Sequence, residues 1–204
     1  MNLDALALDA LAEIVNIGSG RAAAALSELT GERIELSSSV TVCNIAGLTA
    51  ALSQSKEPVE TAVIQDFSGG LGGRALLAFP RASGVVLAKL ISGISCPGNE
   101  LDEDLTGVLE EVGNIVLNSV LGTMSNEANV DLQYSVPKLS IGQQIDSKIL
   151  SKTPGVLPDE LQLVLADTRF RVVNGGITGS LILVFEFGSL QKMLEAVLDR
   201  ATCS

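Results

Sequence analysis

The sequence contains no histidine and no tryptophan, and its aromatic residues are limited to one tyrosine and five phenylalanines. Without histidine the chain cannot form a Ser-His-Asp triad, use a histidine general base or carry phosphohistidine, and it lacks the commonest ligand of transition metals. Any catalysis must therefore depend on carboxylates, amides, hydroxyls or thiols.

Basic residues are also scarce, because 13 Lys and Arg face 24 Asp and Glu, which gives a formal net charge of -11. This charge opposes binding to nucleic acid or to anionic lipid headgroups, and no local basic patch compensates for it. No apolar run approaches the roughly 18 to 20 residues of a membrane span, and acids stand near the N-terminus where a signal peptide carries basic residues. We therefore expect a cytoplasmic protein with no nucleic-acid partner and no membrane insertion.

Cysteine is rare as well. Cys43, Cys96 and Cys203 lie far apart and form no CxxC pair. An odd number of scattered cysteines is typical of reduced thiols in the cytosol. The sequence therefore predicts no disulfide framework and no metal site.

The chain has 204 residues, 47% of them hydrophobic, which is enough to bury a sizeable core. It also resembles itself: EIVNIGSG from Glu13 matches EVGNIVLN from Glu111, and GGLGGRALLAF from Gly69 matches GGITGSLILVF from Gly175. This similarity predicts a single domain, residues 1–204, built of two repeats at about 1–98 and 99–204. The second repeat is longer, and residues 141–160 are expected to form its extra loop.

Each repeat shows the same order of patterns. Apolar residues at helical spacing predict long helices at 3–29 and 101–124, and the small residues of GSGRAAAA predict that these two helices cross. Strands are expected at 34–42 and 130–141, hairpins around the glycine turns at 68–73 and 174–179, and short helices at 83–91 and 188–198. The fold class is therefore α+β, with long helices packed on antiparallel β-sheet and a pseudo-twofold axis relating the halves.

A polar pair recurs on the two long helices. Glu13 and Asn16 lie on adjacent turns of one helix face, and Glu111 and Asn114 repeat that spacing. Asn is a poor helix former, so its presence in both helices indicates a task for the amide. Two tasks stay open at this point: chemistry at the surface, or a hydrogen bond between two buried Asn side chains.

These residues resemble the CheC/CheX/FliY family of chemotaxis phosphatases, whose motif is Asp or Ser, then Glu four residues on, then Asn three further, then Pro twenty-three after the Asn. The first copy matches with Asp9, Glu13 and Asn16 but has Ser39 in place of Pro. The second copy matches with Glu111, Asn114 and Pro137 but has Gly107 in place of the leading Asp or Ser. The duplicated layout resembles CheC more than the single-site CheX, or FliY with its additional C-terminal domain.

The resemblance implies hydrolysis of the aspartyl phosphate on CheY-type receiver domains. In that reading Asn16 or Asn114 positions the attacking water, Glu13 or Glu111 pairs with the receiver's lysine, and Asp9 and Pro137 are auxiliary. Mg²⁺ is held by the receiver, so this chain is expected to bind no cofactor. CheC relatives also bind the receptor deamidase CheD, so the alternative is an impaired interaction module that binds a CheD-type deamidase or a receiver.

Overall fold

The computed structural model describes residues 5–53, 58–93, 101–143, 145, 147–150, 162–172, 175–186 and 188–202. The helices are α1 (Ala5–Thr30), α2 (Ile45–Ser53), α3 (Arg81–Ser92), α4 (Glu103–Ala128), α5 (Ser147–Leu150) and α6 (Ser189–Thr202). The strands are β1 (Glu35–Cys43), β2 (Val59–Gly69), β3 (Gly73–Pro80), β4 (Leu132–Tyr134), β5 (Lys138–Ile141), β6 (Gln162–Val172) and β7 (Gly175–Phe185). The predicted α+β class, with long helices on antiparallel sheet, is confirmed.

All the strands form one sheet in the order β1-β6-β7-β3-β2-β4, and β5 also pairs with β2. Every pairing is antiparallel. Each predicted half therefore places its own hairpin at the centre and sends one strand segment to the outer edge of the other half's hairpin. A duplicated chain would give this order, and the duplication itself stays a prediction.

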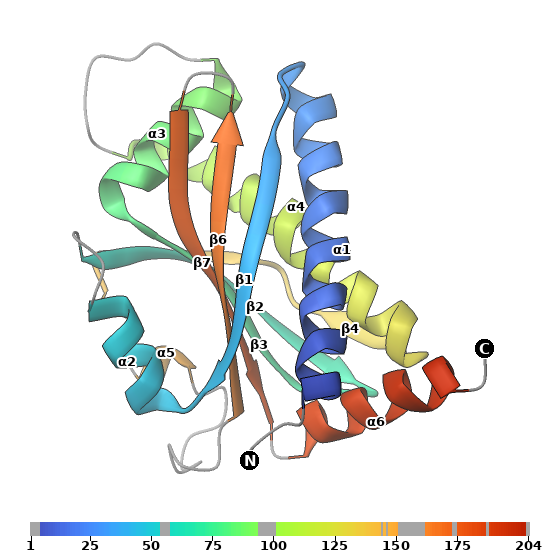
Figure 1. Ribbon diagram of the computed structural model, residues 1–204. Coiled ribbons are helices and arrows are strands. Elements are labelled where there is room, and N and C mark those ends of the chain that lie inside the picture. The colour runs from blue at the N-terminus through green and yellow to red at the C-terminus, as the bar shows by residue number, and fades with distance from the viewer. Residues whose placement is uncertain are drawn as a thin grey trace.

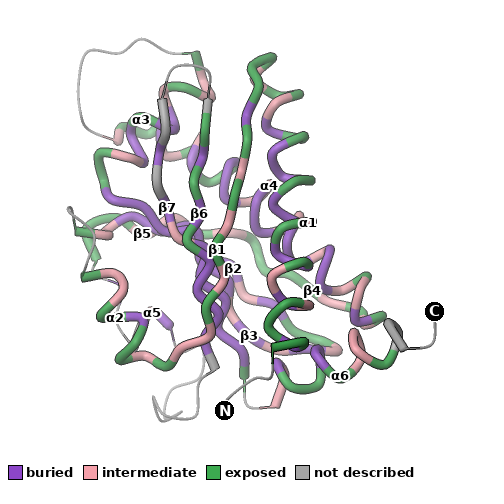
Figure 2. The backbone as a smooth tube through the Cα atoms, viewed as in Figure 1, coloured by how far each residue is buried: buried purple, intermediate pink, exposed green. Residues whose placement is uncertain are grey.

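Helices cover both faces of the sheet (Figure 1). The larger core lies on the face of α1, α3, α4 and α6, where helix residues such as Leu11 and Leu117 pack with Val63 and Phe79 of the sheet. A smaller core on the other face joins α2 and α5 to the sheet through Leu48 and Leu150. The buried residues lie between these layers, whereas the outward faces of the helices are exposed (Figure 2).

The two long helices cross where α1 carries a glycine. A Cβ added to Gly18 would lie 2.7 Å from Val120 Cα in α4. Only a residue without a side chain allows the two backbones to approach so closely. The predicted crossing of the small-residue stretch with the second long helix is confirmed.

Both ends of α4 have capping residues. The Asp102 carboxylate accepts a hydrogen bond from the Leu105 N–H at 2.9 Å, and acids follow in the first turn. Asn129, with φ of 51°, ends the helix in the left-handed conformation that Asn tolerates. The ends of α4 are thus fixed by its own sequence.

Three predictions need correction or restriction. The strand predicted at 130–141 is two short strands, β4 and β5, because Pro137 lies between them and has no N–H for a ladder. The helix α2 was not predicted, and α5 occupies part of the expected 141–160 loop. Residues 151–160, the start of the 174–179 turn, Cys96 and Cys203 lie outside the described residues.

Candidate functional site

The first predicted site lies on the outer face of α1. Asp9, Glu13 and Asn16 are all exposed, as their spacing on one helical stripe predicts. Ser39, which stands where the motif has proline, is an exposed residue of β1. Among the described residues, the Asn16 side chain makes no hydrogen bond, so nothing fixes the direction of its amide.

The second predicted site lies on α4 and is built differently. Glu111 is exposed, but Asn114 is half-buried. Gly107, which replaces the leading acid, is exposed, and a Cβ added there would have no atom within 4 Å. The carboxylate of the second pair is therefore as accessible as that of the first, whereas the amide is partly enclosed.

A chain of three carboxamides lies behind Asn114. The Asn118 Nδ2 donates to Asn114 Oδ1 at 2.6 Å, and the Gln65 Nε2 of β2 donates to Asn118 Oδ1 at 2.9 Å. The same Gln65 Nε2 donates to the backbone carbonyl of Ser135 at 3.0 Å. We call Asn114, Asn118 and Gln65 the amide relay. It connects the exposed face of α4 to the interior of the sheet.

The relay tests the alternative in which Asn16 of α1 and Asn114 of α4 hydrogen-bond to each other. Asn16 is exposed, and Asn114 Oδ1 accepts from Asn118 of its own helix. Within the described part of the chain, Asn16 and Asn114 do not hydrogen-bond to each other. The interhelical pair is therefore wrong.

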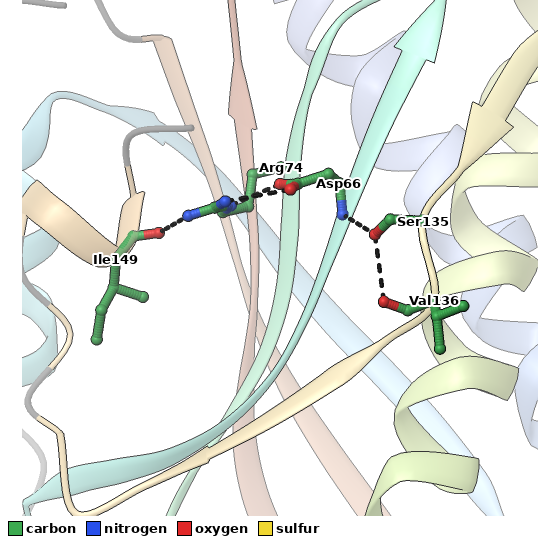
Figure 3. Close-up of polar contacts among 5 residues, drawn as sticks. All are labelled: Asp66, Arg74, Ser135, Val136 and Ile149. Carbon is green, nitrogen blue, oxygen red and sulfur yellow. Dashed lines mark hydrogen bonds and ion pairs between the residues drawn. The ribbon is translucent and has the colours of Figure 1, made fainter. Parts of the chain in front are cut away.

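Pro137 lies in the short linker between β4 and β5, and Ser135 holds the start of that linker against β2. The Ser135 N–H donates to the Asp66 carbonyl at 2.9 Å, and its hydroxyl accepts from the Asp66 N–H at 2.9 Å. The Asp66 carboxylate in turn forms an ion pair with Arg74, at 2.6 Å from Oδ1 to Nε, and Arg74 donates to the carbonyl of Ile149 at 2.6 Å. Figure 3 shows this path from α5 across β3 and β2 to the linker.

The strand that follows the linker, β5, also contacts the exposed face of α4. The Leu139 N–H donates to Glu110 Oε1 at 3.2 Å, one residue before Glu111. Beside this contact, Val136 is 79% exposed and Tyr134 is 39% exposed. Partial burial raises the pKa of the Tyr134 phenol above its ordinary value, and a hydrogen bond with Ser125 lowers it in part. Val136 is therefore an exposed apolar side chain next to Pro137, whereas Tyr134 lies against Ser125 further along α4.

The interior behind the first site contains hydroxyls instead. Ser19 Oγ lies 3.2 Å from Ser38 Oγ, which lies 3.2 Å from Thr168 Oγ1. Ser19 and Thr168 are each only 2% exposed. This hydroxyl chain joins α1, β1 and β6, but it ends in the core and does not reach Asn16.

The sequence reasoning missed Asn118, Gln65 and Ser135. Asn118 had a usable signal, since it is a second Asn four residues after Asn114 on the same helix face. The comparison of repeats concealed it, because Gly20 occupies the matching position of the first copy. Gln65 and Ser135 carried no signal, because their contact with α4 depends on strand pairing.

In the part of the chain that the structure describes, no group of three or more Cys, Asp or Glu residues could hold a metal ion. None of the described helices combines the length and the apolar character that crossing a membrane requires.

Comparison with known proteins relates the first helix to a family. The model of the CheC-like family matches residues 6–37, which include Asp9, Glu13 and Asn16. The flagellar motor switch phosphatase FliY of Bacillus subtilis is 24% identical over 174 residues, which cover 84% of this chain and 44% of FliY. The chain therefore spans less than half the length of that relative.

Solved structures share the fold over almost the whole chain. FliY of Thermotoga maritima superposes with a TM-score of 0.74 at 21% identity, covering 98% of this chain and 99% of that one. The FliM middle domain from H. pylori gives a TM-score of 0.66 at 10% identity, covering 95% and 99%, and FliM from H. pylori has also been solved in complexes with SpeE and with FliG. Residues 6–37 are thus similar to the CheC-like family, and the chain shares the fold of FliY and of the FliM middle domain. The sequence preference for CheC over FliY gains no support from these matches.

Proposed function

We propose that this chain is a phosphatase that hydrolyses the aspartyl phosphate of CheY-type receiver domains in chemotaxis signalling, in the cytoplasm. The observation that carries the proposal is the pair of Glu-x-x-Asn faces on α1 and α4, with Glu13 and Glu111 both exposed. The name of the FliY relative, a flagellar motor switch phosphatase, supports the same class of activity.

The proposed chemistry needs little from the enzyme. An acyl phosphate is labile, so hydrolysis requires a water in line with phosphorus and stabilisation of the charge that develops. Water attacks phosphorus, the bond to the receiver's aspartate breaks, and inorganic phosphate and the free carboxylate leave. Asn16 and Asn114 each offer a neutral amide that can hold this water through its donor and its acceptor.

The exposed carboxylates supply orientation. Glu13 and Glu111 lie one helical turn before their Asn residues, where a lysine of the receiver could pair with them. Such a rim contact guides the encounter and sets the register of docking more than it adds affinity. Asp9 extends the acidic stripe of the first site, and Pro137 shapes the linker beside the second. Mg²⁺ belongs to the receiver in this scheme.

The direct test is the decay of a CheY-type receiver that has been phosphorylated with acetyl phosphate and freed of excess donor. We expect the wild-type chain to accelerate decay and the double variant Asn16→Ala, Asn114→Ala to leave only the spontaneous rate. Asn44→Ala is the matched control, because Asn44 is an exposed carboxamide that caps α2 by accepting from the Gly47 N–H. No acceleration by the wild type would reject the phosphatase, and full activity of the double variant would reject the Asn mechanism.

A second function, binding without catalysis, has its own support in the FliM structures, because FliM shares this fold and is found in complexes with other proteins. Its partners would be a receiver domain or a CheD-type deamidase. Calorimetric titration of both partners discriminates the two functions. Tight binding of the phosphorylated receiver with no change in its decay would favour the interaction module.

A further inference from the structure

The amide relay behind Asn114 has a direction that one backbone atom imposes. The carbonyl of Ser135 can only accept, so the end of the Gln65 amide that faces it, at 3.0 Å, must be the NH₂ group. The second hydrogen of that NH₂ is then available to Asn118, which must present its oxygen at 2.9 Å. The Asn118 NH₂ is thereby turned to Asn114, which must also present its oxygen. A carbonyl in the β4–β5 linker thus orients three amides in series.

The relay is retained at a cost to the fold. Gln65 is only 2% exposed, and its Oε1 has no hydrogen-bond partner among the described residues. A buried acceptor without a partner destabilises the folded state, and an apolar side chain of similar size would avoid that penalty. The glutamine instead contributes the two hydrogen bonds of its NH₂ group, one to the linker at Ser135 and one that orients Asn118.

The first site lacks a counterpart of each part of the relay. Gly20 stands four residues after Asn16, where Asn118 follows Asn114. Ala166 pairs with Leu181 across the β6–β7 hairpin as Gln65 pairs with Ala75 across the β2–β3 hairpin. Asn16 consequently has neither an amide neighbour on its helix nor an anchor in the sheet.

We infer that Asn118 and Gln65 are positioning residues that fix the Asn114 carboxamide, with its oxygen held by the relay and its NH₂ directed outward as a donor for the attacking water or a phosphoryl oxygen. This inference rests on the proposed phosphatase function and applies to the second site alone. One lone pair of Asn114 Oδ1 is occupied by Asn118, and the other stays available. A pre-oriented amide does not have to be ordered during the reaction, so pre-orientation should raise kcat and leave KM nearly unchanged.

The kinetic test uses the full chain with Asn16→Ala to silence the first site and follows the phosphorylated receiver at varied concentration. Asn118→Ala should lower kcat about tenfold with KM changed less than about twofold, because docking is untouched while orientation is lost. Asn118→Asp has the same shape and can accept from Gln65 but cannot donate, so its kcat should fall at least as far. Wild-type kcat in Asn118→Asp would show that shape alone matters and would overturn the inference.

Two further variants separate positioning from folding. Gln65→Met removes the unpartnered oxygen but also the donor to Asn118 and Ser135, so urea denaturation measures the net change in stability while kcat should fall at a protein concentration and temperature where the variant is folded. The matched control is Ser119→Ala, which loses a 2.7 Å hydrogen bond to the Ile115 carbonyl on the same helix but does not contact Asn114. Equal losses of kcat in Ser119→Ala and Asn118→Ala would assign the effect to general loosening of α4 and would contradict the inference.

A measurement without receiver keeps this inference distinct from the proposed function. In ¹⁵N-labelled protein, the Asn114 side-chain NH₂ should have a high order parameter that falls in Asn118→Ala and is unchanged in Ser119→Ala. An equally mobile Asn114 amide in the wild type and in Asn118→Ala overturns the positioning role, whatever the activity. An ordered amide in a wild-type protein that does not accelerate dephosphorylation instead overturns the phosphatase and the catalytic use of the relay.

Discussion

The exposed faces of α1 and α4 carry the same Glu-x-x-Asn pair but differ in what lies behind the asparagine. Behind Asn114, amides lead through Asn118 and Gln65 into the sheet. Behind α1, the buried hydroxyl chain that starts at Ser19 bypasses Asn16. Equal spacing along two helices therefore does not make two equivalent sites, because orientation of a side chain depends on neighbours that a motif does not include.

The family match covers the first site, whereas the hydrogen-bond geometry favours the second. The CheC-like match covers residues 6–37 and so contains the first site, whose Asn16 is exposed and without a hydrogen-bond partner among the described residues. The relay supports the second site, where Pro137 also occupies the motif position. An amide that is free before docking must be ordered by the receiver itself, whereas a pre-oriented amide need not be.

The largest expected effect is the difference between the two asparagines. Asn114→Ala should lower kcat by about 30-fold or more, because a lost positioning group is costly, whereas Asn16→Ala should lower it less than about threefold. Single-turnover decay of a phosphorylated receiver measures both. Equal losses would mean that the two sites are equivalent, and a reversed order would assign the activity to α1.

The second effect concerns the packing of α4 against β2 beneath the relay. A Cβ added to Gly113 would lie 2.5 Å from Val63 Cβ, in a fully buried part of β2. Gly113→Ala should therefore cost about 1–3 kcal/mol of unfolding free energy by overpacking. Gly107→Ala, on the same helix but with open space, should instead gain about 0.5–1 kcal/mol from helix propensity. Urea denaturation compares the two.

The same contrast applies to α1, which packs on α4. Gly18→Ala should destabilise because its Cβ would meet the backbone of Val120, and Gly20→Ala should stabilise because nothing lies within 4 Å. Only Gly113→Ala should also lower second-site activity, because it moves α4 away from Gln65. Loss of second-site activity in Gly18→Ala at matched stability would show that the relay is not confined to the α4–β2 contact.

A smaller effect distinguishes two ion pairs. The Asp66–Arg74 pair beside the Pro137 linker has side-chain exposures of 28% and 18%, whereas Arg33–Glu35 at the start of β1 has 82% and 47%. Double-mutant cycles to alanine should give a coupling of about 1 kcal/mol for the first pair and about 0–0.5 kcal/mol for the second, because water screens the exposed charges. Similar couplings would show that the linker gains no special support from Asp66.

The smallest effect uses Tyr134, the one tyrosine of a chain without tryptophan, which lies on β4 beside Ser125 of α4. Partial burial raises its pKa above 10.0, with Ser125 opposing the rise. Because the folded pKa exceeds the unfolded one, the stabilising contribution of the neutral phenol is complete below about pH 10 and is lost as pH rises through the folded pKa. Alkaline titration of phenolate absorbance should show a higher midpoint in the folded protein than in urea, and equal midpoints would contradict the burial of the ring.

Tyr134 also serves as a reporter of which half of the chain binds the receiver. The first half contains no tyrosine, so with a receiver variant that lacks tyrosine a change in the phenolate midpoint on binding should come from the second half. The change should persist in Asn16→Ala. A change that vanishes in Asn16→Ala would instead place the bound receiver on α1.

Periodicity determined much of this fold in advance. The stripes of Leu, Ile and Ala gave the long helices, the glycine turn at 68–73 gave the β2–β3 hairpin, and Gly18 marked the helix crossing. These features depend on residues a few positions apart or on the size of one side chain, so a linear pattern is enough to show them. The break at Pro137 is also local, because proline lacks the N–H that a strand ladder needs, so the expectation of one strand at 130–141 was avoidable.

The tertiary structure alone decided which residues stand behind each asparagine. Strand order places β2 beside both α4 and the β4–β5 linker, so Gln65, Asn118 and Ser135 meet although they are 53 and 70 residues apart along the chain. Hydrogen bonds of this range are set by the register of strands and by close packing at Gly113, neither of which a repeat comparison contains. The sequence by itself thus determined two Glu-x-x-Asn faces on two helices, and packing decided that only one of them is held by an amide relay.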